Sequence, residues 1–276
     1  MPLSLSNATI EQFKMQFILE FQAVEKLRNT VTDIFGTRGD AYKLSQMGAV
    51  ATTDRGAYQS LIEGSDQEVN QAEIVFSNYT LNLILDIFQE KTVIPGVLAS
   101  LAQTHAKSCG RRCDQVLFDA MAAGKGSTVA VGTTNLTVDK LREAKATMDE
   151  NNVTGDRYIC VTPSQIDSLL AEESVTNVLY NNQRTLVDGD VGTFLGFKFL
   201  PPIGLYPEGG LKKDGDNRSV FCYSKEALTR AFQIAPTVTT DFSPQHQSWL
   251  TISRLRLGAV VNQPVGCVEI LCDETK

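Results

Sequence analysis

A helical pattern of unusual length lies between Pro95 and Gly124. Proline suits the first turn of a helix, because the N–H that it lacks would have no partner there. Seven side chains then recur at helical spacing, namely Leu98, Leu101, His105, Cys109, Cys113, Leu117 and Met121. The pattern continues to Gly124 and Gly126 and predicts a helix of roughly 28 residues, about 42 Å long. Few compact domains need such a helix, so we expect an elongated molecule.

The composition is that of an ordinary globular protein. The 276 residues, of which 42% are hydrophobic and 21% charged, suffice for one large domain or two to three smaller ones. A net charge of -7 has the wrong sign for a protein that grips nucleic acid phosphates over a broad face. No stretch approaches the roughly 20 apolar residues of a membrane span, and the N-terminus lacks a signal-peptide pattern. We therefore expect a soluble, cytosolic chain with no membrane partner.

The cysteines do not form a metal-binding or disulfide pattern. They are scattered and lack CxxC pairs, which favours buried free thiols: Cys109, Cys113, Cys160, Cys222, Cys267 and Cys272. His105, Cys109 and Cys113 share one helix face, but the ends of this set are about 12 Å apart along the axis. Zinc ligands lie at roughly 2.0–2.3 Å from one ion. Packing of a helix face is the better interpretation, and we expect no metal and no cofactor.

The first 90 residues predict an amphipathic helix followed by a long hairpin. Apolar residues at helical spacing, a capping box at Thr9 and Gln12, and a stop at Gly36 predict a helix over residues 9–36. Alternating hydrophobic residues then predict two strands that bracket a long excursion within residues 45–90. Six acids and no lysine or arginine lie between Gly56 and Glu90. Such an acidic hairpin cannot bury much of itself, so we expect it to rest on a neighbour.

Short alternating elements after Gly126 predict a compact α/β unit. STVAVGTT and RYICVT have the pattern of strands, and VDKLREAKATMDE and PSQIDSLLA that of helices. Thr162, Pro163 and Gln165 form a capping box with proline at the first helical position. Two hydrophobic runs close the chain, LTISRLRLGAVV and VGCVEILC. Because they are hydrophobic and terminal, we expect both to pack beside the long helix.

The glycine-rich stretch LVDGDVGTFLGFKF raises the question of a bound ligand. It lacks the alternating oxygen ligands and the closing glutamate of a calcium loop. It also does not open a helix, as a dinucleotide loop would. Its alternation predicts a strand, a turn and a second strand, with Gly189, Gly192 and Gly196 as structural turn residues.

Catalytic motifs are weak. GKGS at residues 124–127 follows a helix and precedes a strand, which is the reverse of a phosphate loop, so it predicts a helix stop and a linker. The sequence has two histidines, no GxSxG elbow and no HExxH motif. A cytosolic α/β enzyme built on residues 127–200 stays an alternative, and it would need a pocket with convergent polar groups. We expect no catalytic residues and a protein that is not an enzyme.

Three segments in a fixed order resemble one protein family. RYICVTPSQIDSLL, RTLVDGDVGTFLGFKFL and RLRLGAVVNQPVGCVEILC are similar to segments of tailed-bacteriophage major capsid proteins of the Hong Kong ninety-seven-type fold. The resemblance implies an α+β fold with an N-terminal arm, an extended loop, a spine helix of a peripheral domain and an axial domain. It assigns these parts to residues 1–44, 45–90, 91–126 and 127–242, with strands 243–276 returning to the peripheral domain.

The resemblance also implies assembly instead of catalysis. Subunits of this family form pentamers and hexamers of an icosahedral shell around double-stranded DNA, which is packaged without sequence specificity. It implies a location in the virion capsid after assembly in the bacterial host cytoplasm, together with a portal and possibly a decoration protein. The candidate intersubunit contacts in the extended loop are Arg55, Tyr58, Glu63, Asp66 and Glu68.

Two departures from the family pattern shape these expectations. Some members link subunits through a loop lysine, but residues 44–90 contain no lysine, so we expect a non-covalent shell. Some members begin with a removable assembly domain, whereas here the arm starts within about ten residues of Met1. We therefore expect a separate scaffolding protein, with an already processed chain as the alternative. An encapsulin-like shell of a bacterial compartment remains the alternative function.

Overall fold

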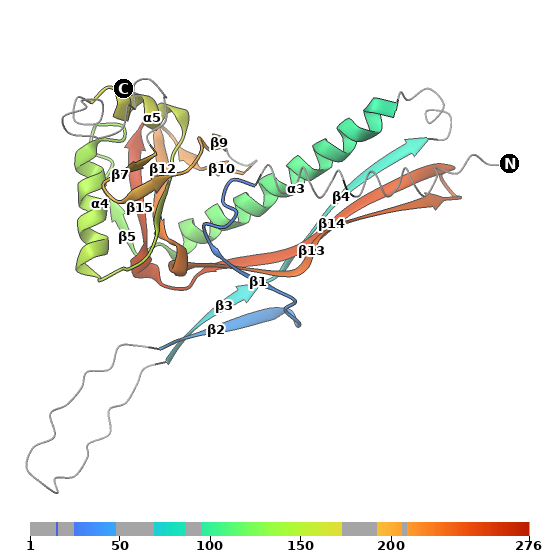
Figure 1. Ribbon diagram of the computed structural model, residues 1–276, viewed down its shortest axis with the longest axis horizontal. Helices are drawn as coiled ribbons and strands as arrows, with labels where there is room; N and C mark the ends of the chain where they lie inside the picture. Colours follow the sequence, from blue (N-terminus) through green and yellow to red (C-terminus); the bar gives the residue numbers. More distant parts are fainter. Residues whose placement is uncertain are drawn as a thin grey trace, which may run out of the picture.

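The computed structural model describes residues 15, 25–47, 69–86, 95–172, 192–205 and 209–275. Figure 1 shows a compact α/β part at one end and an elongated part in which one long helix lies along a sheet. The long helix, α3, spans Pro95–Gly124 and has 30 residues, which corresponds to about 45 Å. The long helix expected from the sequence is thus confirmed, and it is the axis of an elongated molecule.

The elongated part is built on a four-stranded sheet in the order β1-β13-β14-β4. The strands are β1 (Thr32–Phe35), β13 (Leu228–Ser243), β14 (Ser248–Val261) and β4 (Ser77–Asp86). β1 runs parallel to β13, and the other pairs are antiparallel. Alternate side chains of β14 are buried, namely Thr251, Ser253, Leu255 and Leu257. This period of two gives the sheet one face that packs against α3.

A two-stranded ribbon projects from the elongated sheet. It pairs β2 (Ala41–Met47) with β3 (Val69–Val75), with Ala41 opposite Val75 and Met47 opposite Val69. Figure 1 shows the ribbon pointing away from both main parts. Its base is anchored because Ile74 is buried with Phe76 and Ala231. A Cβ atom on Gly258 of β14 would lie 2.3 Å from the carbonyl oxygen of Val75, so only glycine permits this crossing.

In the described residues, the compact part contains a seven-stranded sheet together with the helices α4 and α5. The strand order is β5-β15-β12-β6-β8-β7, and β11 pairs with β12. Its elements are β5 (Ser127–Val129), α4 (Val138–Glu150), β6 (Arg157–Cys160), α5 (Pro163–Leu170), β7 (Thr193–Phe194), β8 (Phe197–Phe199), β11 (Lys213–Asp214), β12 (Asn217–Ser224) and β15 (Cys267–Asp273). Smaller elements are the pair β9 (Gly204–Leu205) and β10 (Gly210–Leu211) and the 3-10 turns η1 (Lys225–Ala227) and η2 (Pro264–Gly266).

Capping fixes the starts of the two helices of the compact part. The Thr137 side chain accepts a hydrogen bond from the backbone N–H of Lys140 at the start of α4. At the start of α5, the Gln165 side-chain oxygen accepts the N–H of Thr162 at 3.0 Å, and Pro163 occupies the first turn. The predicted capping box is therefore confirmed.

The prediction of one helix over residues 9–36 is wrong at its C-terminal end. Residues 25–31 form turns, and Thr32–Phe35 form strand β1. The backbone of β1 pairs with the edge of β13, and this tertiary pairing overrides the helical spacing. Gly36 has a positive φ of 74°, so it ends a strand and not a helix. Of the residues before 25, the structure describes Met15 alone, which is helical.

The chain also crosses between the two parts at places that differ from the expected boundaries. Residues 228–242, expected in the compact unit, pair in the elongated sheet as β13. β15, expected to return to the elongated part, instead lies in the compact sheet between β5 and β12. β15 is buried on both faces, and a continuous hydrophobic run suits such a central strand. In the expected hairpin of residues 45–90, the segment Ser77–Asp86 is β4 of the elongated sheet.

Candidate functional site

The described part of the glycine-rich stretch, residues 192–199, forms a tight hairpin. β7 and β8 pair antiparallel, and only Leu195 and Gly196 lie between them. Both have positive φ, 51° and 86°, as a two-residue turn between strands requires. A Cβ on Gly196 would meet no atom within 4 Å, so its backbone conformation explains the glycine. Gly192 also has a positive φ, 58°, and its carbonyl accepts the N–H of Phe199 at 2.8 Å.

This hairpin confirms the predicted strand, turn and strand for residues 193–199. Gly189 lies outside the described residues, and so do the five candidate contact residues Arg55, Tyr58, Glu63, Asp66 and Glu68.

The helix-face residues His105, Cys109 and Cys113 pack against the elongated sheet. His105 Nδ1 lies 3.0 Å from Ser253 Oγ, and burial lowers the pKa of this imidazole. Cys109 and Cys113 belong to a core cluster with residues of β13 and β14. Burial raises the pKa of the Cys109 thiol to about 11 and that of Cys113 well above its ordinary value, so both stay neutral at pH 7. The packing interpretation is confirmed, and all six cysteines are free and buried.

The described residues contain no group of three or more His, Cys, Asp or Glu side chains arranged to hold a metal ion. Within the same ranges, no helix combines the length and the apolar character needed to cross a membrane.

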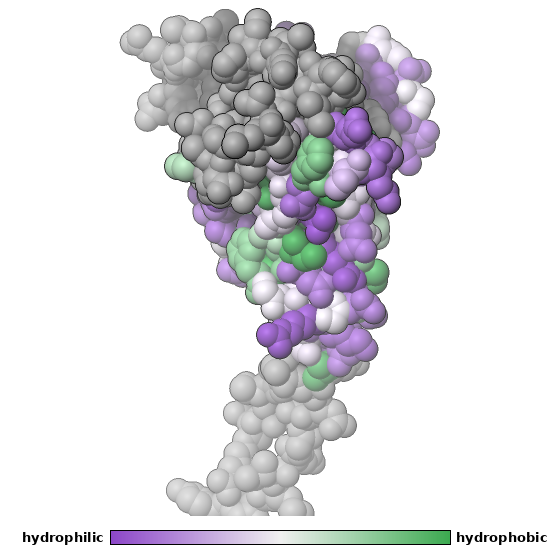
Figure 2. Space-filling view, turned by 90° about the vertical axis from the view of Figure 1, so that its right-hand side faces the viewer, coloured by the Kyte–Doolittle hydropathy of each residue, from purple (hydrophilic) through white to green (hydrophobic). Residues whose placement is uncertain are grey.

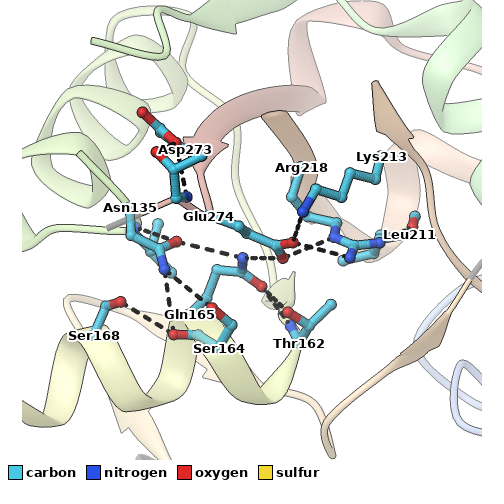
Figure 3. A network of polar contacts seen from close by, with 12 residues as sticks. Asn135, Thr162, Ser164, Gln165, Ser168, Leu211, Lys213, Arg218, Asp273 and Glu274 are labelled. Carbon is cyan, nitrogen blue, oxygen red and sulfur yellow. Dashed lines mark hydrogen bonds and ion pairs between the residues drawn. The ribbon is translucent and has the colours of Figure 1, made fainter. Parts of the chain in front are cut away.

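A polar network surrounds Glu274 at one end of the compact sheet (Figure 3). Arg218 donates from Nε and Nη2 at 2.8 and 3.0 Å, Gln165 donates at 2.9 Å, and Lys213 Nζ lies at 3.0 Å. The hydrogen bonds from Arg218 are the largest cause that lowers the pKa of Glu274 to about 2. Both carboxylate oxygens are thus taken by side chains of the protein, so the network holds α5, β11, β12 and the C-terminal segment together. Sequence reasoning missed this network, since its members are up to 109 residues apart.

The exposed face of α3 carries positive charge. Lys107, Arg111 and Arg112 are exposed there, and residues 95–113 contain no acid. A hollow of about 460 Å³ lies between this helix and β4. Arg112 covers the ring of Tyr79 on its wall, with Cζ 4.5 Å from the ring centroid. The sequence analysis missed this basic face, although the spacing of Lys107 and Arg111 at i and i+4, which puts both on one side of a helix, could have indicated it.

Large hydrophobic side chains are exposed on the sheet and on the ribbon. Those of the elongated part are Phe35, Val69, Val75, Ile84, Ile234 and Phe242. Val75 on the ribbon is 68% exposed. Figure 2, which views the far end of the elongated part, shows hydrophobic residues interspersed with hydrophilic ones. The coloured part of this face therefore does not form one continuous apolar patch.

Comparisons with known proteins agree on one family. A model of the family described as phage capsid protein matches residues 5–274. The search of curated proteins found no match.

Among solved structures, the capsid of cyanophage P-SCSP1u aligns with a TM-score of 0.69 and 16% identity, covering 89% of this chain and 87% of that one. The structure from Mycobacterium phage Che8 aligns with a TM-score of 0.67 and 16% identity, covering 84% of this chain and 85% of that one. A virus-like particle from Pyrococcus furiosus aligns with a TM-score of 0.63 and 10% identity, covering 94% of this chain and 98% of that one. These similarities confirm the α+β fold of the Hong Kong ninety-seven type. Together with the match over nearly its whole length, they show that the chain belongs to the phage capsid protein family and is a major capsid protein.

Proposed function

We propose that copies of this chain assemble without a cofactor into the pentamers and hexamers of an icosahedral phage head that encloses double-stranded DNA. The observation that carries the assembly step is the β2–β3 ribbon. Among the strands that the structure describes, these two pair only with each other, and most side chains of β3 are exposed. An isolated two-stranded ribbon is marginally stable in water. Contact with a neighbouring copy would supply the burial that the ribbon lacks within its own chain.

Charge complementarity supports a neighbouring copy as the partner. Residues 56–90 carry six acids and no base, whereas the exposed face of α3 carries Lys107, Arg111 and Arg112. Opposite charges on two surfaces of one chain favour contact between copies and disfavour contact between like surfaces. In this proposal Arg55, Tyr58, Glu63, Asp66 and Glu68 contact the adjacent subunit. They would lie in the extended loop of residues 45–90, next to an arm of residues 1–44.

The proposal also covers the domains and the further partners. In it, the spine helix would correspond to residues 91–126 and the axial domain to the compact part, whose last strand is β15. Assembly would take place in the bacterial host cytoplasm with a separate scaffolding protein, a portal and possibly a decoration protein. The net charge of -7 suits a container that must not hold its DNA tightly. The protein would act by assembly and not as an enzyme.

Electron microscopy of negatively stained, purified full-length protein tests the proposal. We expect closed shells or capsomers, and nuclease-protected DNA inside particles that form in phage-infected cells. The second candidate is the encapsulin-like shell of a bacterial compartment, which would hold a protein cargo in place of DNA; the virus-like particle from Pyrococcus furiosus shows that this fold also builds particles described as virus-like. Shells that contain a cargo protein and no DNA would support that candidate. A stable monomer or dimer with turnover of a small molecule would contradict assembly altogether.

A further inference from the structure

Three carboxylates and one guanidinium meet where residues 25–35, here named the N-terminal strap, join the body of the molecule. The four groups come from the strap, α3 and β13: Glu25, Asp33, Asp114 and Arg230. Arg230 is 1% exposed, Asp114 is 3% and Glu25 is 8%. Asp33 is only partly buried, with 19% of its side chain exposed. Two buried acids that share one buried base are unusual, because each unpaired buried charge is costly.

Arg230 donates hydrogen bonds to the two carboxylates of the strap. Its Nε and Nη2 donate to the two oxygens of Asp33 at 2.7 and 2.9 Å, and its Nη1 donates to Glu25. The guanidinium also lies over the ring of Phe232, 4.7 Å from its centroid. This arrangement pairs one positive charge with two negative charges before Asp114 is counted.

Asp114 on α3 holds the strap through its backbone. Its Oδ2 accepts the N–H of Lys26 at 3.1 Å, and its Oδ1 accepts the N–H of Leu27 at 3.3 Å. Leu27 is fully buried in the main core, and Thr30 contacts the Tyr223 hydroxyl at 2.7 Å. The strap therefore enters the body beside one carboxyl group on α3.

The surroundings of Asp114 favour its neutral form. Burial is the largest cause that raises its pKa to about 7, and nearby Glu25 raises it further. The two backbone N–H groups and Arg230 act in the opposite direction. Cys113 on α3, Cys160 on β6 and Tyr223 on β12 also face it, but burial raises the pKa of each well above its ordinary value, so they stay neutral.

We propose that Asp114 is a proton-controlled latch for the N-terminal strap, which is held firmly while this carboxyl is neutral and less firmly once it ionises. When the strap is released, the ionised carboxylate gains access to water and moves away from Glu25. All the groups belong to one chain, so the latch does not depend on shell formation. Its failure in a test would leave the proposed assembly untouched.

The direction of the pH effect follows from the two states. The pKa of Asp114 is about 7 with the strap in place, against an ordinary 3.8. In the proposed released state it would fall toward this ordinary value, because water would reach the carboxylate and Glu25 would lie further away. The latched state therefore binds a proton that the released state lacks between these values. The free energy that keeps the strap in place is most favourable below about pH 4 and becomes less favourable as the pH rises through 7. Above this range it no longer changes with pH.

Hydrogen exchange of the full-length chain, read by mass spectrometry, tests the latch in purified shells and in unassembled subunits. The measured quantity is the protection of a peptide that covers Lys26 and Leu27, corrected for the intrinsic exchange rate at each pH. Linkage predicts a fall in protection of about 20-fold between pH 5.5 and 7.5. A peptide from β12 serves as the reference and should not change in this range. Equal protection of the strap at both pH values would overturn the proposal.

Three variants identify the group responsible. Asp114→Asn keeps one acceptor but cannot ionise, so the protection of its strap should not depend on pH. Glu25→Gln keeps an acceptor for Arg230 and removes the negative charge next to Asp114. The midpoint of the curve of strap protection against pH should therefore move to lower pH. Asp119→Asn changes an exposed carboxylate on the same helix, bonded to Gln115, and should leave the midpoint unchanged. If Asp114→Asn fails to fold, Glu25→Gln still tests the proposal. The pH at which half of the change in strap protection has occurred should then be lower than in the unchanged chain, and an unshifted value would overturn the latch.

Discussion

Glu274 shows how one side chain can connect four segments of the chain. The side chain is 9% exposed and accepts hydrogen bonds from Arg218 and Gln165. Its pKa is about 2 against an ordinary 4.5, so its stabilising effect is complete above about pH 4.5 and is lost as the pH falls through 2. We expect Glu274→Gln to lower the free energy of unfolding at pH 7 by about 1.5–3 kcal/mol, since it removes charged hydrogen-bond acceptors. Urea unfolding of the unassembled subunit, followed by circular dichroism, measures this change.

The matched control is Glu150→Gln, an exposed acid at the end of α4. It should change the free energy of unfolding by less than about 0.5 kcal/mol. The difference between Glu274→Gln and the unchanged chain should be smaller at pH 3 than at pH 7. An equal loss at both pH values would mean that the charge of Glu274 does not stabilise the compact part.

Residue patterns predicted local features well where the cause was also local. The capping box at Thr162 and Gln165 spans three positions, and the turn at Gly196 depends on backbone conformation alone. Asp114 and Arg230 could not be predicted in the same way. They meet because α3 and β13 pack together, 116 positions apart in the sequence, and one sequence gives no sign of that meeting.

At the scale of elements, the crossing of the ribbon over β14 depends on Gly258. A Cβ there would lie 2.3 Å from the carbonyl oxygen of Val75 and 2.7 Å from Ile74 Cγ2. We expect Gly258→Ala to displace β3 and to lower the free energy of unfolding by about 1–3 kcal/mol, the usual cost of overpacking. Because β3 is half of the projecting ribbon, the yield of shells should fall as well. Urea unfolding and sedimentation of assembled material measure the two effects.

Gly204→Ala is the control for this prediction. A Cβ on Gly204 would meet no atom within 4 Å, so we expect both stability and shell yield to remain close to those of the unchanged chain. If Gly258→Ala assembled and unfolded as Gly204→Ala does, the close approach of β3 to β14 would not limit the position of the ribbon.

Elements with a strong period were predictable, but their partners were not. The spacing of the apolar residues from Pro95 to Gly124 predicted α3, since in a helix of 30 residues the buried positions recur every three to four residues over many turns. The strand β1 was mistaken for the end of a helix because its four residues are too few to show an alternation. Residues 228–242 were placed in the compact unit but form β13 of the elongated sheet, and β15 was placed with the elongated part but lies in the compact sheet. Hydrophobic runs predict strands, but the choice of sheet depends on pairings that are distant in sequence.

At the scale of the whole molecule, the proposed non-covalent shell depends on two kinds of intersubunit contact. In that proposal one is made by the β2–β3 ribbon and the other by the positive face of α3. Residues 44–90 contain no lysine, so this loop cannot supply an amine for a bond to a neighbour. We expect shells boiled in detergent and reductant to run as one band of 30.2 kDa on a gel. Before boiling, rising salt should loosen the shells, because pairing of the acidic loop with Lys107, Arg111 and Arg112 is screened. A ladder of linked subunits after boiling would contradict the non-covalent shell, and shells indifferent to salt would contradict the charge pairing alone.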